Sequence, residues 1–226
     1  MTGFSVLMVC TGNICRSPAA ERLLASAMNP FDGVTVSSAG IGAMVGQPID
    51  GPTATLLDRR GVDTSAFASR SITPRMIEAS DLILTMTRRQ QSAVLLQVPS
   101  AGRRTFLLRE LAMLVSTGET GAQAEAARAA EAQWTLPDYS TVDSATVESA
   151  IPDPADRLRT AISSATSARA VRGATRGLEN FDIDDPYRQP DRVLLGCFAR
   201  IEESITVLAE FLRSTTRKTP DESTSP

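Results

Sequence analysis

Residues 10–17, Cys-Thr-Gly-Asn-Ile-Cys-Arg-Ser, decide how this chain is interpreted. They follow the apolar run 6–9 and precede residues 18–28, which have helical character. This order places a loop between a strand and a helix N-terminus, where backbone N–H groups and the helix dipole favour an anion. Cys10 is a candidate nucleophile, because the thiolate is the attacking form of cysteine, and Arg16 can hold two phosphoryl oxygens at once. The pattern predicts a loop that binds a phosphate group and attacks its phosphorus.

The spacing of Cys10 and Arg16 alone is weak evidence, since a buried cysteine beside an exposed arginine arises easily by chance. The whole string in a strand, loop and helix context is much more specific. Ser17 has two roles open to it. It can donate to the Cys10 thiolate, or it can cap the helix that Pro18 opens.

Residues 10–18 resemble the signature of the low-molecular-weight protein tyrosine phosphatase family, C-x-G-N-x-C-R-S-P. The resemblance implies that Cys10 forms a phosphocysteine intermediate and that Arg16 holds the phosphoryl group. The substrate-binding residues that it implies within the loop are Thr11, Gly12, Asn13, Ile14, Cys15 and Ser17, with Thr11 and Ile14 at the rim. Thiol-dependent arsenate reductases of the same fold share much of this loop, so the loop alone leaves both activities open.

The chain contains no histidine. This excludes a Ser-His-Asp or Cys-His arrangement and makes a histidine-based metal site impossible. Any proton donor must therefore be a carboxylate or, as a weaker candidate, a Tyr or Lys side chain. We expect no metal and no cofactor, since the loop itself supplies the positive field that a phosphoryl group needs.

Residues 184–187, Asp-Asp-Pro-Tyr, offer the best candidate for the proton donor, because the proline stiffens the loop and directs the preceding carboxylate. The string resembles the acid loop of the same family. The resemblance implies that Asp185 is first the acid and then the base, and Tyr187 could form one wall of the cleft. Arg188 stands where many family members carry another aromatic residue.

Two further features concern Cys15, which allows two interpretations, and Asn13, which supports the shape of the loop. Cys15 is close enough to Cys10 in sequence to be joined to it under oxidation, or it is a small packing residue; the resemblance favours the redox role. The resemblance also implies that Asn13 adopts a left-handed conformation and bonds Ser38, a supporting residue at the end of the second expected strand. Arg70 is expected to be structural, and Ala43 lies near where a variable-loop aromatic often sits.

Apolar runs alternate with helical stretches, which predicts an α/β fold with a four-stranded parallel sheet and helices on both faces. The expected strands are residues 4–10, 33–38, 81–85 and 104–107, and the expected helices are 18–28, 52–60, 74–79 and 88–97. Ligands bind beyond the carboxyl ends of such strands, where the Cys10 loop falls.

The sequence predicts a single phosphatase domain, 1–213, with an insertion at about 113–178 and a disordered tail, 214–226. Within the insertion we expect a helix at 119–133, a loop-like stretch at 134–154 and a weakly amphipathic helix from Leu158 to about residue 172. These helices could cover the site or a partner surface. A final helix should run from about residue 194 to 212, with Cys197 in the core.

The chain has 226 residues, of which 42% are hydrophobic and 22% are charged, and this composition is ordinary for a soluble globular protein. Its net charge of -3 argues against bulk nucleic-acid binding. Three cysteines make no disulfide framework, and no signal peptide or long apolar span is evident, so we expect a cytoplasmic protein with no membrane contact. The oligomeric state stays open.

These observations predict a protein tyrosine phosphatase that hydrolyses phosphotyrosine or aryl phosphate monoesters through a phosphocysteine intermediate. The expected partner is a phosphotyrosine protein, for which a bacterial tyrosine kinase is the family default. One alternative is an arsenate reductase that uses an external thiol, since residues 84–87 contain no resolving cysteine. The other is a non-catalytic phosphate-binding regulatory module.

Overall fold

The computed structural model describes residues 3–28, 33–116, 153–175 and 180–216. Its sheet has four parallel strands in the order β2-β1-β3-β4. Their bounds are β1 Phe4–Cys10, β2 Val34–Gly40, β3 Leu82–Thr85 and β4 Thr105–Leu107. These strands match the four expected ones to within two residues at each end. The predicted fold class is confirmed.

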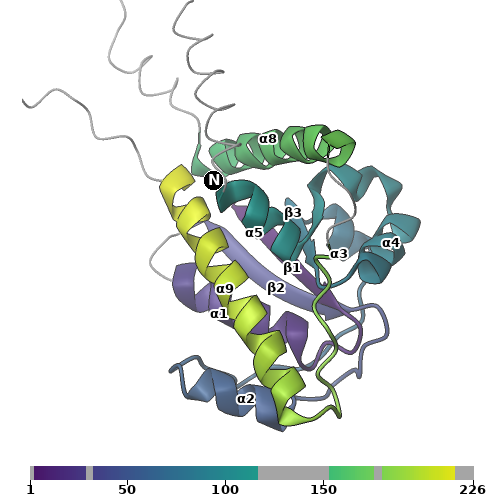
Figure 1. Cartoon of the computed structure of the whole chain (residues 1–226), viewed down its shortest axis with the longest axis vertical. Helices are drawn as coiled ribbons and strands as arrows, with labels where there is room; N and C mark the ends of the chain where they lie inside the picture. The colour runs from purple at the N-terminus through teal and green to yellow at the C-terminus, as the bar shows by residue number, and fades with distance from the viewer. Residues whose placement is uncertain (1–2, 29–32, 117–152, 176–179, 217–226) are drawn as a thin grey trace, which may run out of the picture.

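Helices cover both faces of this sheet (Figure 1). The alternating side chains of β1 divide between them: Phe4 and Met8 pack on one face, and Leu7 and Val9 on the other. The first face is covered by α1 (Arg16–Met28), α5 (Leu108–Ser116) and α9 (Asp191–Thr216), with α2 (Gly51–Asp58) beside α1. The second is covered by α3 (Pro74–Glu78), α4 (Arg88–Gln97) and the short 3-10 helix η1 (Pro99–Arg104).

Helix α8 (Pro154–Thr175) is the described part of the predicted insertion, and it lies across the amino ends of the strands (Figure 1). Its Arg159 pairs with Asp81, which precedes β3, and donates to the carbonyl oxygen of Gly3, which precedes β1. Leu158 is buried as its spacing predicted, whereas Val171 is exposed. Because the Cys10 loop follows the carboxyl end of β1, α8 lies at the opposite end of the sheet and does not cover that loop.

Two helices run past the expected limits of the insertion and the tail, and one of them, α5, was not among the expected helices. Helix α5 continues to Ser116, past the expected start of the insertion, because Leu111 and Leu114 are buried in the core beside α9. Helix α9 continues to Thr216, past the expected start of the tail. The helix expected at 119–133, the loop-like stretch up to residue 152 and the tail from residue 217 lie outside the described residues.

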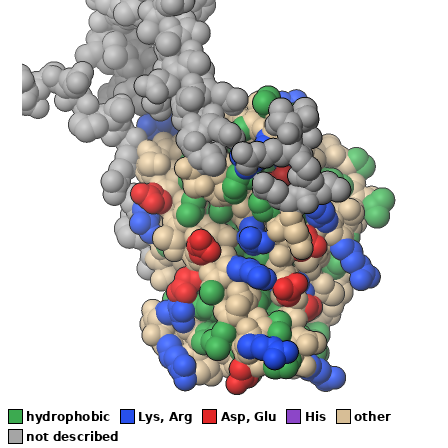
Figure 2. Space-filling view, in the orientation of Figure 1, with side chains coloured by type: hydrophobic (Ala, Val, Ile, Leu, Met, Phe, Trp, Pro, Cys, Tyr) green, Lys and Arg blue, Asp and Glu red, His purple; other side chains and the backbone are tan. Residues whose placement is uncertain are grey.

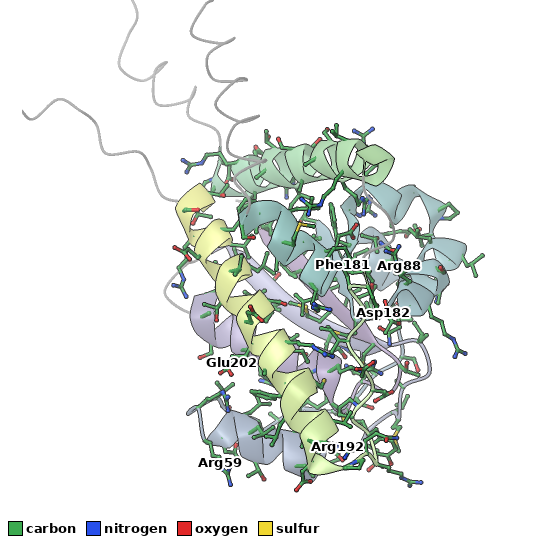
Figure 3. The ribbon with its side chains drawn as sticks, viewed as in Figure 1. Arg59, Arg88, Phe181, Asp182, Arg192 and Glu202 are labelled. Atoms are coloured by element: carbon green, nitrogen blue, oxygen red, sulfur yellow. The ribbon has the colours of Figure 1, made fainter. Side chains whose placement is uncertain are left out.

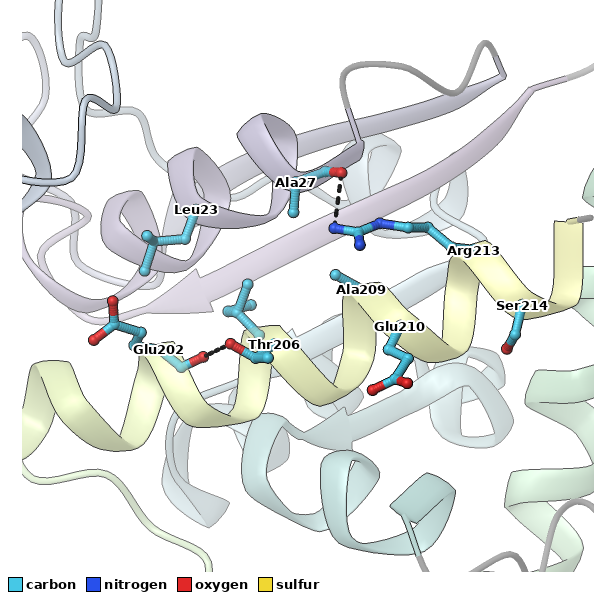
Figure 4. Close-up of a pocket in the computed structure, with 9 residues that line it drawn as sticks. Leu23, Ala27, Glu202, Thr206, Ala209, Glu210, Arg213 and Ser214 are labelled. Atoms are coloured by element: carbon cyan, nitrogen blue, oxygen red, sulfur yellow. Dashed lines mark hydrogen bonds between the residues drawn. The ribbon is translucent and has the colours of Figure 1, made fainter.

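The surface around α9 is mixed in charge, with acidic and basic side chains interspersed over the face shown in Figure 2. A groove of about 460 Å³ lies between α1 and α9, where Leu23 and Ala27 face Thr206 and Ala209 (Figure 4). It lies toward the C-terminal end of α1, whereas the Cys10 loop precedes the N-terminal end. None of the helices in the described ranges combines the length and apolar character needed to cross a membrane.

Candidate active site

The Cys10 loop connects the end of β1 to the first residue of α1, Arg16. The Sγ atom of Cys10 accepts a hydrogen bond from the backbone N–H of Asn13 at 3.2 Å and from the hydroxyl of Ser17 at 2.9 Å. Ser17 lies inside α1, so of its two predicted roles the structure has the hydrogen bond to sulfur. Donors directed at sulfur favour the thiolate over the thiol.

Asn13 holds the loop in shape from a left-handed conformation, with φ of 55°. Asparagine tolerates this region better than most residues. Its side-chain amide donates to Ser17 Oγ at 2.9 Å and to Ser38 Oγ at 2.8 Å, and its Oδ1 accepts from the N–H of Arg70 at 2.9 Å. The bond between Asn13 and Ser38 that the family resemblance implied is therefore present, and both residues are buried.

A carboxylate that the sequence reasoning missed lies behind this network. The Ser38 hydroxyl donates to Glu21 Oε2 at 2.5 Å, and the Arg70 guanidinium donates to the Ser38 carbonyl oxygen at 2.9 Å. Glu21 lies four residues after Ser17, so both side chains project from the same face of α1. That spacing was the available signal for a role of Glu21 at the loop.

The predicted acid and the predicted phosphate-binding arginine meet directly. Arg16 donates through Nη2 to Asp185 Oδ2 at 2.5 Å and through Nη1 to the carbonyl oxygen of Ile183 at 3.0 Å. The Arg16 side chain is only 4% exposed, whereas that of Asp185 is 52% exposed. A buried guanidinium and a solvent-accessible carboxylate therefore lie side by side at one loop.

The segment that carries Asp185 is anchored to the connection between β3 and α4. Ile183 donates its N–H to the Met86 carbonyl oxygen at 2.8 Å, and Asp182 accepts from the N–H of Arg88 at 2.9 Å. Figure 3 shows Asp182 and Arg88 next to each other at the start of α4. Asp184 points elsewhere and pairs with Arg200 of α9 at 3.2 Å.

Gln90, a second residue that the sequence reasoning missed, joins this connection to the Cys10 loop. Its Oε1 accepts from the N–H groups of Met86 and Thr87, each at 3.0 Å, which leaves its Nε2 to donate to Thr11 Oγ1 at 3.1 Å. Thr87 and Gln90 form a capping box at the start of α4, a pattern that the sequence itself contains.

The two sides of the Cys10 loop differ in polarity. Tyr187 is half-buried, and the Arg188 guanidinium lies 5.1 Å from the centre of its ring. On the other side the exposed Met44 donates its N–H to the Gly12 carbonyl oxygen at 2.9 Å. Met44 and Val45, and not Ala43, are the exposed large apolar residues there. Of the two expected rim residues, Thr11 is exposed and Ile14 is buried.

All three cysteines are free thiols and are buried. Burial, with a smaller contribution from the Asp50 carboxylate, raises the pKa of the Cys15 thiol to about 12. Burial likewise raises the pKa of Cys197 to about 12, and its expected place in the core is confirmed. Within the described residues, no group of three or more Cys, Asp or Glu side chains is arranged to hold a metal ion.

Residues 5–121 match the family model of the low molecular weight phosphotyrosine protein phosphatases. The chain belongs to this family. It is 38% identical over 107 residues to the probable low molecular weight protein-tyrosine-phosphatase EpsP of Ralstonia solanacearum, a match that covers 47% of this chain and 72% of EpsP. It is 40% identical over 103 residues to Etp of Escherichia coli K12, which covers 46% of this chain and 68% of Etp. The family and enzyme class predicted from the sequence, a phosphatase, are confirmed.

The likeness in fold extends further along this phosphatase than the likeness in sequence. Vibrio vulnificus Wzb, solved in complex with benzylphosphonate, superposes with a TM-score of 0.56 over 92% of this chain and 98% of Wzb, at 24% identity. The family match ends before Asp185, whereas the superposition extends beyond it, since it covers 92% of this chain. Membership therefore rests on residues 5–121, and beyond them the likeness to Wzb is one of fold alone.

Proposed function

We propose that this phosphatase hydrolyses phosphotyrosine and other aryl phosphate monoesters through a phosphocysteine intermediate. The observation that carries the proposal is the meeting of Cys10, Arg16 and Asp185 at the carboxyl ends of the strands. Cys10 receives two hydrogen bonds on its sulfur, and Arg16 contacts Asp185 at 2.5 Å. Nucleophile, anion clamp and proton donor are thereby within reach of one phosphoryl group.

In the first step the Cys10 thiolate attacks phosphorus, so that an S–P bond forms and the P–O bond to the leaving group breaks. Arg16 and the N–H groups of the loop hold the equatorial oxygens and stabilise their charge. Those oxygens compete with the Asp185 carboxylate for the Arg16 guanidinium. Asp185, released from this ion pair, takes up a proton from solvent, and it is this proton that it donates to the leaving oxygen. A proton delivered there avoids expulsion of a free phenoxide or alkoxide.

In the second step Asp185, now ionised, accepts a proton from water as the water attacks the phosphocysteine. The S–P bond breaks, inorganic phosphate leaves and the Cys10 thiolate is regenerated. Each step uses groups of the chain alone, because the loop supplies the positive field that metal ions supply in other phosphoryl-transfer enzymes. A disulfide between Cys10 and Cys15 would switch the enzyme off reversibly under oxidation.

The substrate class is supported by two observations. The relatives EpsP and Etp are named protein-tyrosine-phosphatases. Tyr187 of this chain is half-buried two residues from Asp185, where an aryl ring could stack on it. We infer that a phosphotyrosine protein is the substrate and that a bacterial tyrosine kinase is the first partner to test, in the cytoplasm.

The two alternative functions have less support. Arsenate reduction needs a thiol that attacks an arseno-cysteine adduct, and Leu84 to Thr87 offers none, so an external thiol would be required. In a non-catalytic phosphate-binding module, a carboxylate beside Arg16 would compete with phosphate for the guanidinium and would contribute nothing to binding. The position of Asp185 therefore favours hydrolysis.

Burst kinetics with an aryl phosphate test this proposal. The wild-type chain should release a rapid burst of phenol equal to the enzyme concentration, followed by slower turnover. Cys10→Ser should abolish turnover, and Asp185→Asn should slow phenol release by about 10²-fold or more, because general acid catalysis contributes roughly that much. Asp184→Asn is the matched control, since Asp184 is exposed and pairs with Arg200, and it should stay within about twofold of wild type.

Turnover that survives Cys10→Ser would rule out the phosphocysteine mechanism. Equal effects of Asp184→Asn and Asp185→Asn would rule out Asp185 as the specific proton donor. Phosphate binding without any phenol release would instead support the non-catalytic module, and thiol-dependent arsenate turnover without a burst would support the reductase.

A further inference from the structure

We propose that Arg188 is a specificity-determining residue that selects substrates in which an acidic side chain stands next to the phosphotyrosine. The proposal rests on the proposed function, which places the aryl group of the substrate against Tyr187. It narrows the substrate class to phosphotyrosine within an acidic stretch of a protein. Two features of Arg188 support it, the conformation of its backbone and the charge of its side chain.

Arg188 occupies the third position of a tight turn, in a conformation that arginine rarely adopts. The N–H of Gln189 donates to the carbonyl oxygen of Pro186 at 3.0 Å and closes the turn, in which Arg188 has φ of 58°. A positive φ at this position favours glycine or asparagine, because a Cβ atom makes the left-handed region costly. The chain has an arginine where glycine would cost less, and this points to a function of the side chain.

The turn is attached to the candidate acid, which gives its tip a defined place at the site. The N–H of Tyr187 donates to Asp185 Oδ1 at 3.2 Å, while Oδ2 of the same carboxylate accepts from Arg16. The Arg188 guanidinium lies 5.1 Å from the centre of the Tyr187 ring, within the range of a cation–π contact. An aryl group bound against Tyr187 would therefore have a positive charge beside it.

No carboxylate neutralises this charge within the part of the chain that the structure describes. The preceding acidic residues have other partners: Asp182 accepts from the N–H of Arg88, Asp184 pairs with Arg200, and Asp185 pairs with Arg16. The Arg188 side chain is exposed, and its described contact is the Tyr187 ring. A planar guanidinium in this state can bind a carboxylate through two parallel hydrogen bonds.

The opposite side of the Cys10 loop has a different character. The large side chains exposed there are the apolar Met44 and Val45. A carboxylate beside the phosphotyrosine is therefore stabilised on the Tyr187 side and gains nothing from these two side chains. Glutamine has nearly the shape of glutamate but lacks its charge, and it forms a weaker hydrogen bond with a guanidinium. The difference between Glu and Gln at this place in a substrate thus measures the contribution of Arg188.

Two phosphotyrosine peptides test the proposal, one with Glu on both sides of the phosphotyrosine and the other with Gln on both sides. In the wild-type chain kcat/KM should be about fivefold higher for the Glu peptide, since an exposed ion pair contributes up to about that factor. The ratio should approach one in about 0.5 M NaCl, because salt screens an exposed pair. Both peptides meet the same catalytic groups, so the ratio is insensitive to changes in the chemical step or in the folded fraction.

Substitutions at Arg188 separate charge from shape. Arg188→Gln should reduce the ratio to about one, Arg188→Glu should invert it, and Arg188→Lys should retain most of it because the charge remains. Arg192→Gln is the matched control. Arg192 is an exposed arginine at the start of α9, beyond the turn (Figure 3), and its substitution should leave the ratio within about 1.5-fold of wild type.

A ratio near one in the wild-type chain, or a ratio that Arg188→Gln leaves unchanged, would overturn the proposal. An equal fall in Arg192→Gln would also overturn it, because the preference would then come from the general positive charge of this face. A chain that hydrolyses neither peptide would instead reject the proposed function.

The role of Arg188 can also be decided without turnover. The Cys10→Ser variant should bind the Glu peptide with a Kd about fivefold lower than that of the Gln peptide, as measured by fluorescence anisotropy. The double variant Cys10→Ser with Arg188→Gln should lose this difference. Equal affinities of the two peptides for Cys10→Ser would contradict the proposal.

Discussion

Gly40, the last residue of β2, shows how closely two loops approach at the site. A Cβ atom at this position would lie 2.4 Å from the carbonyl oxygen of Thr11 and 3.1 Å from the Cα of Ala43. The N–H groups of the next residues bond the same loop, Ile41 to the Cys10 carbonyl oxygen and Gly42 to that of Thr11, both at 3.0 Å. Only glycine leaves room for this approach, so the shape of the Cys10 loop depends on a residue of another strand.

We predict that Gly40→Ala displaces the Thr11 carbonyl group and lowers kcat/KM for an aryl phosphate by about tenfold or more, since small displacements of catalytic groups are costly. Gly42→Ala is the matched control, because its Cβ would meet only a Thr11 methyl group at 3.9 Å, an ordinary contact. The two variants are compared by steady-state kinetics and by circular dichroism. A wild-type kcat/KM in Gly40→Ala would contradict the prediction, because it would show that the Cys10 loop accommodates the added methyl group without loss of activity.

At the scale of elements, α8 is attached to the sheet by arginines. Arg169 donates to the carbonyl oxygens of Thr105 at 2.7 Å and Gly102 at 2.9 Å, and its guanidinium lies 4.3 Å from the centre of the Phe106 ring. Burial holds the pKa of Arg169 below its usual value, although the nearby Glu110 opposes this. These contacts make α8 part of the structure around β4 and not a separate appendage.

We predict that Arg169→Met lowers the free energy of unfolding by about 2 kcal/mol, because it removes two hydrogen bonds from a charged donor and leaves two carbonyl oxygens without it. The kcat of the folded fraction should be unchanged, since α8 lies at the far end of the sheet from Cys10. Urea unfolding gives the first quantity and active-site titration the second. Ser167→Ala, on an exposed turn of the same helix, should change neither.

At the scale of the whole molecule, Asp81 ties together three segments that are far apart in sequence. It accepts from the N–H and the hydroxyl of Ser5 in β1, at 2.8 and 2.9 Å, and from Arg159 in α8 at 2.9 Å, while it directly precedes β3. Burial opposes the ionisation of Asp81, but hydrogen bonds from Arg159 and Ser5 outweigh it and hold the pKa of Asp81 below its usual value. Ionised Asp81 therefore stabilises the assembled fold.

The lowered pKa of Asp81 predicts how stability depends on pH. The unfolded chain binds a proton at Asp81 more readily than the folded one, so the contribution is complete above about pH 4 and is lost as the pH falls through the folded-state pKa. Asp81→Asn should thus lower the unfolding free energy by about 1–2 kcal/mol at neutral pH, and the difference from wild type should shrink in acid. Denaturant unfolding across pH measures this. Asp156→Asn removes the more exposed partner of Arg159 and should have a smaller effect.

The sequence was sufficient for features set by local chemistry. Apolar runs predicted the four strands and the described helices other than α5 and η1. A motif that resembles one family predicted the left-handed Asn13 and its bond to Ser38. Glu21 and Gln90 were missed because each is an ordinary polar residue on a helix. Their importance comes from the atom that each one meets in another segment.

By itself the sequence determined the parallel sheet and the strand, loop and helix around Cys10, and it predicted the candidate nucleophile and the candidate acid, because periodicity and loop chemistry act over a few neighbouring residues. Only the tertiary structure decided that Asp185 meets Arg16, its partner 169 positions earlier, and that α8 lies at the amino ends of the strands. Contacts of that kind depend on which buried surfaces and hydrogen-bonding groups fit together once the chain is packed. No local pattern of residues encodes them.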